Sequence, residues 1–489
     1  MADFLKIHPG DNVAVALQTV SGGTVFSGIV ASCDIPQGHK MALTPLKPGD
    51  MVIKYGFPIG QATREIQPGD WVHSHNLKTN LTGQEAYCYE PRISWPDHRE
   101  PASFLGYRRP DGRAAIRNEV WIIPTVGCVN DIAEALVREN QDLVQGIDGL
   151  YAFPHPFGCS QTGEDHTQTR KLLTSLAQHP NAGGVLVLSL GCENLTQEQF
   201  IDQLGDFDRE KIRFMVCQQA EDEMAAGRAL LEQCIRYAAR FQREPIPASE
   251  LVLGLKCGGS DGLSGITANA VVGRFSDLLI GQGGTTILTE VPEMFGAEGM
   301  LMDRCITEAV FRKTVDCIQG YKDYFLRHNE VIYENPSPGN RAGGITTLEE
   351  KSCGCVQKGG TAPIVDVLGY ADRISTRGLN LLYGPGNDLV SSTALAAAGA
   401  HMVLFTTGRG TPFGAPVPTV KIATNTPLAE KKHRWIDFNA GSIADGQCTI
   451  PACAEDLMAL VLEIASGGQT KSEKNQCRQI AIFKNGVVL

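Results

Sequence analysis

The stretch VLVLSLGCEN, residues 185–194, is an apolar run that stops at a glycine and a cysteine. Short apolar runs bounded by turn residues are typical of strands buried on both faces, as in parallel sheets. Three other stretches have the same form and end on Cys128, Cys159 and Cys257. Ligands of open parallel sheets bind beyond the carboxyl ends of the strands, where helix N-termini converge. The pattern therefore predicts an α/β protein with thiols along the edge that carries its site.

The character of the sequence changes along the chain and predicts about three domains, which 489 residues can supply. Residues 1–80 alternate short apolar runs with the turn tripeptide Pro-Gly-Asp, which predicts a small β domain. Residues 81–104 carry prolines without periodicity and are interpreted as a linker. Strand-like and helix-like stretches alternate over 105–242 and again over 251–489, with a proline-rich break at 243–250. This alternation predicts two α/β domains with parallel sheets.

Composition excludes several classes of partner. A net charge of −11 argues against nucleic acid, and an anionic substrate would need local positive groups or a metal. No apolar run of about 18 residues indicates a membrane span, so no membrane partner is expected. The first residues, MADFLKIHPGDN, lack the apolar stretch of a signal peptide, which favours a cytoplasmic protein. Fifteen cysteines in that compartment are expected to be reduced rather than paired in disulfides.

The spacing of the cysteines does not match a local metal loop. Cys128, Cys159 and Cys192 lie about one βα unit apart, which fits one ligand per unit rather than a zinc finger. Cys353 and Cys355 lack a partner pair at zinc spacing and are interpreted as loop thiols. Neither GxGxxG nor GxxxxGK[ST] follows a predicted strand, so a nucleotide site is weakly supported.

Several polar side chains lie near predicted strand ends and are candidates for chemistry. His155 suits a general base or a metal ligand, and Asp261 and Glu290 suit acid–base work or metal binding. Arg409 can clamp a carboxylate through its bidentate guanidinium. The other candidates for binding substrate are Lys421, Ser260, Thr411, and the pair His73 and His75, which we expect on one side of a strand.

Distinctive stretches occur in order along the chain: IKYGFPIGQA, WVHSHN, TVGCVN, HPFGCSQ, LGCEN, CGGSDGLSGITAN, TEVPEMFGAE, NPSPGN and TTGRGTPFG. Together they resemble the altronate/galactarate dehydratase family, and the paired histidines resemble its altronate branch. The resemblance implies an N-terminal β-clip (SAF-like) domain, a second α/β domain associated with dimerisation, and a C-terminal Rossmann-like α/β domain. The dimerisation domain implies a homodimer. The resemblance also implies a hydro-lyase that needs ferrous iron and reducing conditions and converts D-altronate to 2-dehydro-3-deoxy-D-gluconate and water.

The identity of the metal centre stays open at this point. Thiolate ligands favour iron or an iron–sulfur cluster over magnesium, whereas carboxylate and imidazole ligands would favour a mononuclear ferrous ion, with Mn²⁺ as a substitute. The expected metal ligands are Cys128, Cys159, Cys192 and Cys257. The alternative to a metal role is that these thiols only fill tight turns.

Three other functions compete with altronate dehydration. The first is dehydration of another sugar acid such as galactarate. The second is an NAD-dependent oxidoreductase, against which the missing dinucleotide fingerprint counts. The third is a sugar-acid binding protein without chemistry, which would not need so many thiols and carboxylates at strand ends.

Overall fold

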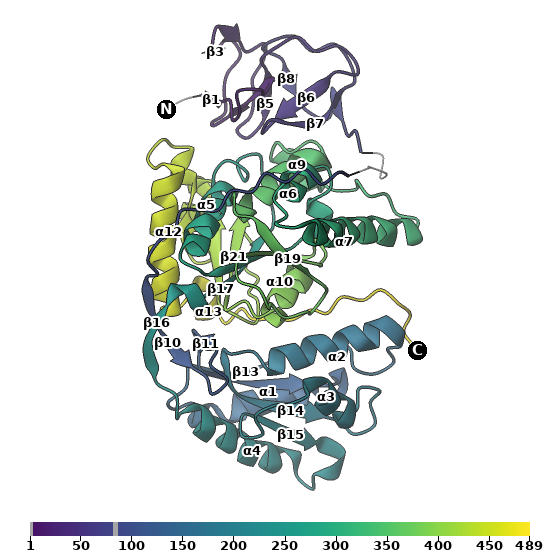
Figure 1. Ribbon diagram of the computed structural model, residues 1–489, viewed down its shortest axis with the longest axis vertical. Coiled ribbons are helices and arrows are strands. Elements are labelled where there is room, and N and C mark those ends of the chain that lie inside the picture. The colour runs from purple at the N-terminus through teal and green to yellow at the C-terminus, as the bar shows by residue number, and fades with distance from the viewer. Residues whose placement is uncertain (1–2, 82–86) are drawn as a thin grey trace.

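The computed structural model describes residues 3–81 and 87–489 of the chain. Figure 1 shows three bodies stacked along the long axis, and their order in space differs from their order in the sequence. The C-terminal α/β body lies in the middle, between the N-terminal β body and the second α/β body. The predicted fold class, a small β domain followed by two α/β domains, is confirmed.

The N-terminal body is built from short antiparallel strands joined by tight turns. One sheet has the order β1-β2-β5-β8, and a second has the order β6-β7-β9. The Pro-Gly-Asp turns close because the aspartate accepts a backbone hydrogen bond from three residues earlier, as Asp50 does from Lys47 and Asp70 from Gln67. The strands are β1 Phe4–Leu5, β2 Val13–Ala16, β3 Val25–Phe26, β4 Ile29–Val30, β5 Lys40–Ala42, β6 Met51–Lys54, β7 Phe57–Ala62, β8 Trp71–Val72 and β9 Leu77–Lys78.

The second body is a parallel four-stranded sheet with the order β13-β12-β14-β15. Its central strand β14 is buried along its whole length, which explains the continuous apolar run in the sequence. The strands are β12 Glu119–Pro124, β13 Gly149–Ala152, β14 Ala182–Ser189 and β15 Ile212–Val216. The helices are η1 Gly127–Val129, α1 Asn130–Glu139, η2 Gln141–Leu143, α2 Gly163–Ala177, α3 Gln197–Leu204, η3 Cys217–Gln219 and α4 Glu223–Ala238.

A three-stranded antiparallel sheet joins the two α/β bodies. Its strands span the predicted limits of the second domain, near residues 104 and 243. Strand β10, Ser103–Arg108, pairs with β11, Ala114–Ala115, and with β16, Arg243–Pro247. The segment 243–250 is therefore a strand followed by the short helix η4, Ala248–Glu250, and not a plain break. Its two prolines are tolerated because β16 is an edge strand, where a missing N–H leaves no ladder bond unmade. The domain limits predicted from composition, at residues 80, 104, 242 and 251, remain predictions.

The C-terminal body contains a parallel seven-stranded sheet with the order β19-β20-β18-β17-β21-β22-β23. Leu253 and Leu255 of β17 belong to the core that includes α5 and α12, whereas Val403 and Phe405 of β21 belong to a core shared with α10. The sheet is thus covered on both faces. Its strands are β17 Val252–Cys257, β18 Thr285–Leu288, β19 Ile364–Leu368, β20 Leu379–Leu382, β21 Met402–Thr407, β22 Thr419–Ala423 and β23 Phe438–Asn439.

The helices of this body include long covering helices and short segments near the strand ends. They are α5 Ala268–Gly281, η5 Val291–Glu293, α6 Glu298–Met302, α7 Glu308–Arg327, α8 Pro338–Ala342, α9 Leu348–Cys355, η6 Val356–Gly359, α10 Asp388–Ala397, α11 Thr426–Lys431, η7 Gly441–Ile443, α12 Ile450–Ala465 and α13 Lys471–Lys474. Among the described residues, no helix combines the length and hydropathy that crossing a membrane requires.

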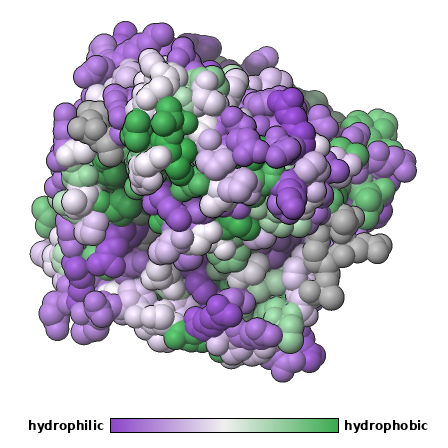
Figure 2. Space-filling model, turned by 90° about the horizontal axis from the view of Figure 1, so that it is seen from above, coloured by the Kyte–Doolittle hydropathy of each residue, from purple (hydrophilic) through white to green (hydrophobic). Residues whose placement is uncertain are grey.

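The N-terminal body sits on the segment that includes α9. Thr347 Oγ1 donates to the Ile59 carbonyl of β7, and Thr79 Oγ1 donates to Glu349 of α9. Figure 2 looks down on this end of the molecule, where hydrophilic residues predominate and apolar ones are scattered among them. Contact with α9 places the N-terminal body over one edge of the large sheet.

Candidate active site at the junction of the first and last domains

Two thiols and two carboxylates meet at the carboxyl edge of the C-terminal sheet. The ligand atoms of Cys257, Glu290, Glu293 and Cys355 all lie within 4.8 Å of one another, and all four residues are buried. The Cys257 Sγ lies 3.7 Å from the Cys355 Sγ and 3.5 Å from Glu293 Oε2. Within the described parts of the chain, this is the group of at least three such residues that could hold a metal ion.

Local backbone structure positions these donors. Cys257 is the last residue of β17, and Glu290 follows β18 in the left-handed conformation, with φ of 74°. Such a conformation is costly for a residue other than glycine and is found at functional sites that the surrounding fold holds in place. Cys355 ends α9, so the prediction that it is a loop thiol is wrong.

Three buried lysines neutralise the carboxylates of this group. Lys358 Nζ lies 3.1 Å from Glu290 and 2.8 Å from the Cys355 Sγ, and Lys256 also pairs with Glu290. Lys351 Nζ lies 2.8 Å from Glu293. Burial alone would raise the pKa of Glu293, but Lys351, with Lys256 and Lys358, lowers it to about 2. Glu293 is therefore ionised at neutral pH.

The N-terminal body adds a second buried ion cluster to the same junction. Lys40 of β5 and Lys54 of β6 each lie 2.8 Å from a carboxylate oxygen of Glu350 on α9. Although burial would raise the pKa of Glu350, the two lysines lower it to about 2. Burial lowers the pKa of Lys40 to about 8 against the opposing effect of Glu350. The Lys40 ammonium also donates to Gly344 O and Thr346 Oγ1, so all three of its protons have acceptors.

The two histidines, His73 and His75, differ in their burial and in their contacts at this junction. Strand β8 ends at Val72, so His73 and His75 lie in the turn after it and do not share a strand face as predicted. His73 is half-buried, stacks on Trp71, and places Nδ1 3.5 Å from Thr346 Oγ1. Burial, with Lys40 and His39, lowers the pKa of His73 to about 4, so its imidazole is neutral. His75 is exposed.

Two cavities adjoin these groups. The smaller, of about 10 Å³, is lined by residues that include Lys54, Ser260 and Lys351 and has room for about one water molecule. The larger, of about 450 Å³, is lined by residues that include Asn335 and Arg341. Lys351 links the two, because it lines the smaller cavity and its Nζ donates to Asn335 Oδ1 of the larger one at 3.1 Å. A sugar acid fits the volume of the larger cavity.

Two further predicted residues lie beside the cluster. Ser260 is buried with its Oγ 3.6 Å from the Cys257 Sγ. Asp261 is half-buried and accepts hydrogen bonds from Thr424, Ser264 and Asn425. Burial raises the pKa of Asp261, and these donors oppose the shift. Asp261 is not part of the thiol–carboxylate group; its hydrogen bonds tie the loop after β17 to the end of β22.

Of the two basic residues predicted to bind the substrate carboxylate, Arg409 lies at the carboxyl edge of the C-terminal sheet and Lys421 does not. Arg409 lies in the loop after β21 and donates to Gly339 O at 2.8 Å, close to the larger cavity's loop, while Thr411 follows in the same loop. Lys421 lies in the middle of β22 and not at a strand end, so that expectation is wrong. Its Nζ is 3.7 Å from the Phe405 ring centre, and burial lowers its pKa to about 7.

His155 is a structural residue. It is buried, its Nε2 lies 2.8 Å from Pro124 O, and its Nδ1 accepts from the Phe157 N–H at 3.2 Å. Burial lowers its pKa to about 4, so the ring is neutral and both nitrogens are occupied by backbone groups. The prediction of His155 as a catalytic base is wrong for this reason.

The remaining predicted ligands gather at the other α/β body. Cys159, Cys128 and Cys192 follow β13, β12 and β14, which are neighbours in the sheet, and all three are exposed. Their sulfur atoms are not all within 4.8 Å of one another in the described structure. Cys257 does not join them, because it belongs to the buried group in the C-terminal body. The expected convergence of all four thiols is therefore wrong for Cys257.

Several residues of the junction were missed in the sequence. Cys355, Glu350, Lys351 and Lys358 all come from one stretch, EEKSCGCVQKGG, whose density of charges beside thiols was the available signal. Lys40 lies in none of the quoted stretches, and Lys54, although part of IKYGFPIGQA, carried no signal of its role. They act through a contact between residues about 300 positions apart, which no local pattern encodes.

Fold and site together define an α/β enzyme whose sheet edge is covered by an N-terminal β domain. Three family models match consecutive blocks: the altronate/galactarate dehydratase SAF domain at residues 2–80, the second domain of D-galactarate dehydratase/altronate hydrolase at 106–239, and the C-terminal domain of D-galactarate/altronate dehydratase at 248–488. The chain belongs to the altronate/galactarate dehydratase family.

Full-length relatives agree with this assignment. The chain is 52% identical to altronate dehydratase of Escherichia coli strain K12, covering 99% of this chain and 100% of the relative. It is 51% identical to altronate dehydratase of Bacillus subtilis strain 168, covering 100% of both. It is 34% identical to galactarate dehydratase (L-threo-forming) of E. coli strain K12, covering 99% and 97%.

Proposed function

We propose that the protein dehydrates D-altronate to 2-dehydro-3-deoxy-D-gluconate and water at the junction of its first and last domains. The observation that carries the proposal is a continuous set of contacts at this junction. His73 reaches Thr346, Lys40 binds Thr346 and Glu350, and Lys351 next to Glu350 pairs with Glu293 of the thiol–carboxylate group. Two relatives named altronate dehydratase are about half identical over the whole chain, whereas the galactarate enzyme is more distant. Altronate is therefore favoured over galactarate.

The reaction breaks two bonds on neighbouring carbons. A base removes the proton from the carbon next to the carboxylate, the electron pair forms a carbon–carbon double bond, and the hydroxyl on the next carbon leaves as water after protonation. The enol then becomes the 2-keto acid. His73 is the proposed base: its imidazole is neutral and can accept the proton, although burial makes it a weaker base than a free histidine. Lys351 and Arg409 can hold the substrate carboxylate.

The buried donor group fits a divalent ion of borderline softness. Two thiols and two carboxylates suit Fe²⁺, with Mn²⁺ as a substitute, better than Mg²⁺. Lys256, Lys351 and Lys358 already neutralise the carboxylates, so binding of an ion requires some of these lysine bonds to open. When bound, such an ion stabilises negative charge that develops on the substrate carboxylate.

Turnover without nucleotide tests the reaction. Protein prepared without oxygen and loaded with ferrous iron should release a 2-keto acid from D-altronate, with kcat/KM at least tenfold above that for galactarate. A requirement for NAD would instead indicate an oxidoreductase. Saturable binding of altronate without product, with either Fe²⁺ or Mn²⁺, would indicate a binding protein.

Iron content of cysteine variants tests the placement of the metal. Cys355→Ser should lose bound iron and activity, while Cys33→Ser, an exposed thiol of the N-terminal body, should keep both. The competing placement is an iron–sulfur cluster on Cys128, Cys159 and Cys192. It is supported by the position of these three cysteines after neighbouring strands of one sheet and by the exposure of their thiols. Iron lost from Cys159→Ser and retained in Cys355→Ser would move the metal to that edge.

We further propose a cytoplasmic homodimer, which rests on the family resemblance. Light scattering of the purified protein should give twice the chain mass of 52.7 kDa. A mass equal to one chain at micromolar concentration would contradict the dimer.

A further inference from the structure

A large cavity lies at the opposite edge of the C-terminal sheet. Its volume is about 1210 Å³, and it is bounded by the β10–β11 turn, the second body and the C-terminal body. Its lining includes Val252, Thr285 and His401, at or just before the first residues of β17, β18 and β21. Val252 and Cys257 are five residues apart on β17, roughly 16 Å at about 3.3 Å per residue. This cavity is therefore separate from the candidate active site.

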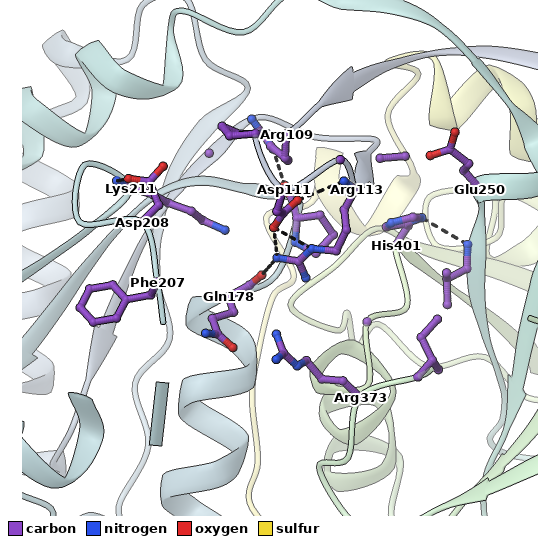
Figure 3. A pocket seen from close by; sticks show the side chains of 18 of the residues that line it. Arg109, Asp111, Arg113, Gln178, Phe207, Asp208, Lys211, Glu250, Arg373 and His401 are labelled. Carbon is purple, nitrogen blue, oxygen red and sulfur yellow. Dashed lines mark hydrogen bonds and ion pairs between the residues drawn. The ribbon is translucent and has the colours of Figure 1, made fainter. Parts of the chain in front are cut away.

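Positive side chains from three segments line this cavity. Arg109 and Arg113 come from the turn between β10 and β11, and Lys211 precedes β15. Arg373 and Arg377 come from the connection between β19 and β20. Figure 3 shows Arg109, Arg113, Lys211 and Arg373 drawn around one space. Five cations around one cavity reverse locally the charge of a chain whose net charge is −11.

Four of these cations, Arg109, Lys211, Arg373 and Arg377, have no carboxylate partner within residues 3–81 and 87–489. The guanidinium of Arg109, 4% exposed, donates only to neutral oxygens, at 2.8–2.9 Å. The ammonium of Lys211 donates to the His179 carbonyl at 2.9 Å. Arg373 has neither a hydrogen bond nor an ion pair in this part of the chain. The exposed Arg373 and Arg377 and the Lys211 ammonium are thus available to a ligand, and Arg109 adds positive charge from the cavity wall.

Most carboxylates of the lining are already engaged elsewhere. Asp111 pairs with Arg113 at 2.6 Å, and Glu250 pairs with Arg108, which does not line the cavity. Asp208 accepts from the Tyr237 hydroxyl and from backbone N–H groups. Asp206 is the remaining lining carboxylate. In the described residues, these acids therefore form no ion pair with Arg109, Lys211, Arg373 or Arg377.

Burying cations without a partner charge is unfavourable. Burial lowers the pKa of Lys211 well below its usual value, and the positive charges of Arg109 and Arg113 lower it further. Burial also lowers the pKa of Arg109 to about 10. A bound anion would offset the cost of these charges, since guanidinium groups form paired hydrogen bonds with carboxylates and phosphates.

We propose that this cavity binds a small organic anion that carries at least two carboxylate or phosphate groups. The volume exceeds that of a single phosphate, and the cations stand on separate walls, so one ligand can contact both α/β bodies at once. Such a ligand would contact the second body and the amino ends of the strands of the C-terminal sheet. The candidate active site lies at the carboxyl ends of the same strands.

Calorimetric titration with pyrophosphate and with citrate tests the proposal on the full chain. At least one of the two anions should bind saturably with a stoichiometry of one per chain. The heat of binding should exceed the heat measured with sodium chloride at the same ionic strength. The double variant Arg373→Gln/Arg377→Gln should weaken binding at least tenfold, because both side chains are exposed and their loss leaves folding and basal turnover unchanged. Tighter binding of pyrophosphate than citrate would assign phosphate chemistry, and the reverse would assign carboxylate chemistry.

Arg312→Gln, an exposed arginine on α7 far in sequence from the cavity lining, is the matched control and should bind like wild type. Absence of saturable binding of both anions to wild type, or equal affinity in the double variant, would overturn the proposal.

Lys211→Met separates a ligand role from a structural one. If Lys211 binds the anion, its replacement should leave the thermal midpoint of the ligand-free protein unchanged or higher. It should also abolish the increase in thermal midpoint that the anion causes in wild type. A lower midpoint together with an unchanged anion response would show that Lys211 only supports the His179 carbonyl.

Discussion

His73 and His75 follow the same short strand and both contact the Trp71 ring, yet His73 also reaches Thr346 at the domain junction. His73 lies between Trp71, His39 and Thr346 at the domain junction, whereas His75 is exposed. If His73 is the base, His73→Ala should lower kcat/KM for altronate at least about 100-fold, the usual effect of a lost general base. His75→Ala is the matched control and should stay within about threefold in the same assay. Similar losses in both variants would remove the distinction between them.

Glu350 holds two buried lysines, so its charge should matter for stability. Glu350→Gln should cost about 3–5 kcal/mol, because it leaves Lys40 and Lys54 buried without their partner. The folded-state pKa of Glu350, about 2, lies below its usual value of 4.5. Its contribution to stability is therefore fully present above about pH 4.5 and is lost as the pH falls toward 2.

Denaturant unfolding between pH 7 and pH 3 measures both effects. The variant should be less stable at pH 7 and should lose less further stability on acidification than wild type. Glu308→Gln removes an exposed ion pair on α7 and should change stability by about 0.5 kcal/mol or less. A change as small in Glu350→Gln would contradict the buried cluster.

The loop after β17 and the turn before β5 touch without room for a side chain. A Cβ on Gly262 would lie 2.0 Å from Gly38 O, a backbone atom of the N-terminal body. Gly262→Ala should therefore push the N-terminal body away from the sheet edge and lower kcat/KM at least tenfold. Hydrogen exchange should show faster exchange of the β5 and α9 amides. Gly320→Ala in α7, where a Cβ would meet nothing within 4 Å, should keep full activity and be neutral or slightly stabilising.

The candidate active site takes groups from both ends of the chain, and this makes a prediction for the whole molecule. Residues 85–489 expressed alone should retain less than about 1% of the activity, because they lack Lys40, Lys54 and His73. Addition of a separate chain of residues 1–84 should restore part of it, since Glu349 and Glu350 offer the same buried partners. Full activity of residues 85–489 alone would place the site elsewhere.

Local patterns were sufficient for the order of domains and for part of the site. The continuous apolar strands and the Pro-Gly-Asp turns predicted the α/β and β bodies, because burial on both faces and fixed turn conformations both act over a few residues. Cys257, Glu290 and Ser260 were found because strand ends are predictable. The strand β16 was missed, because its two prolines suggest a break unless its edge position is known.

The sequence by itself determined which segments form strands, which thiols follow them, and the family to which the chain belongs. Only the tertiary structure decided which of these residues meet. It placed the C-terminal body between the other two, brought Lys40 and Lys54 onto Glu350, and joined Cys355 to Cys257. It also assigned His155 and Lys421 to the interior. The physical reason is that strand formation depends on neighbours in sequence, whereas burial and ion pairing depend on contacts between residues hundreds of positions apart.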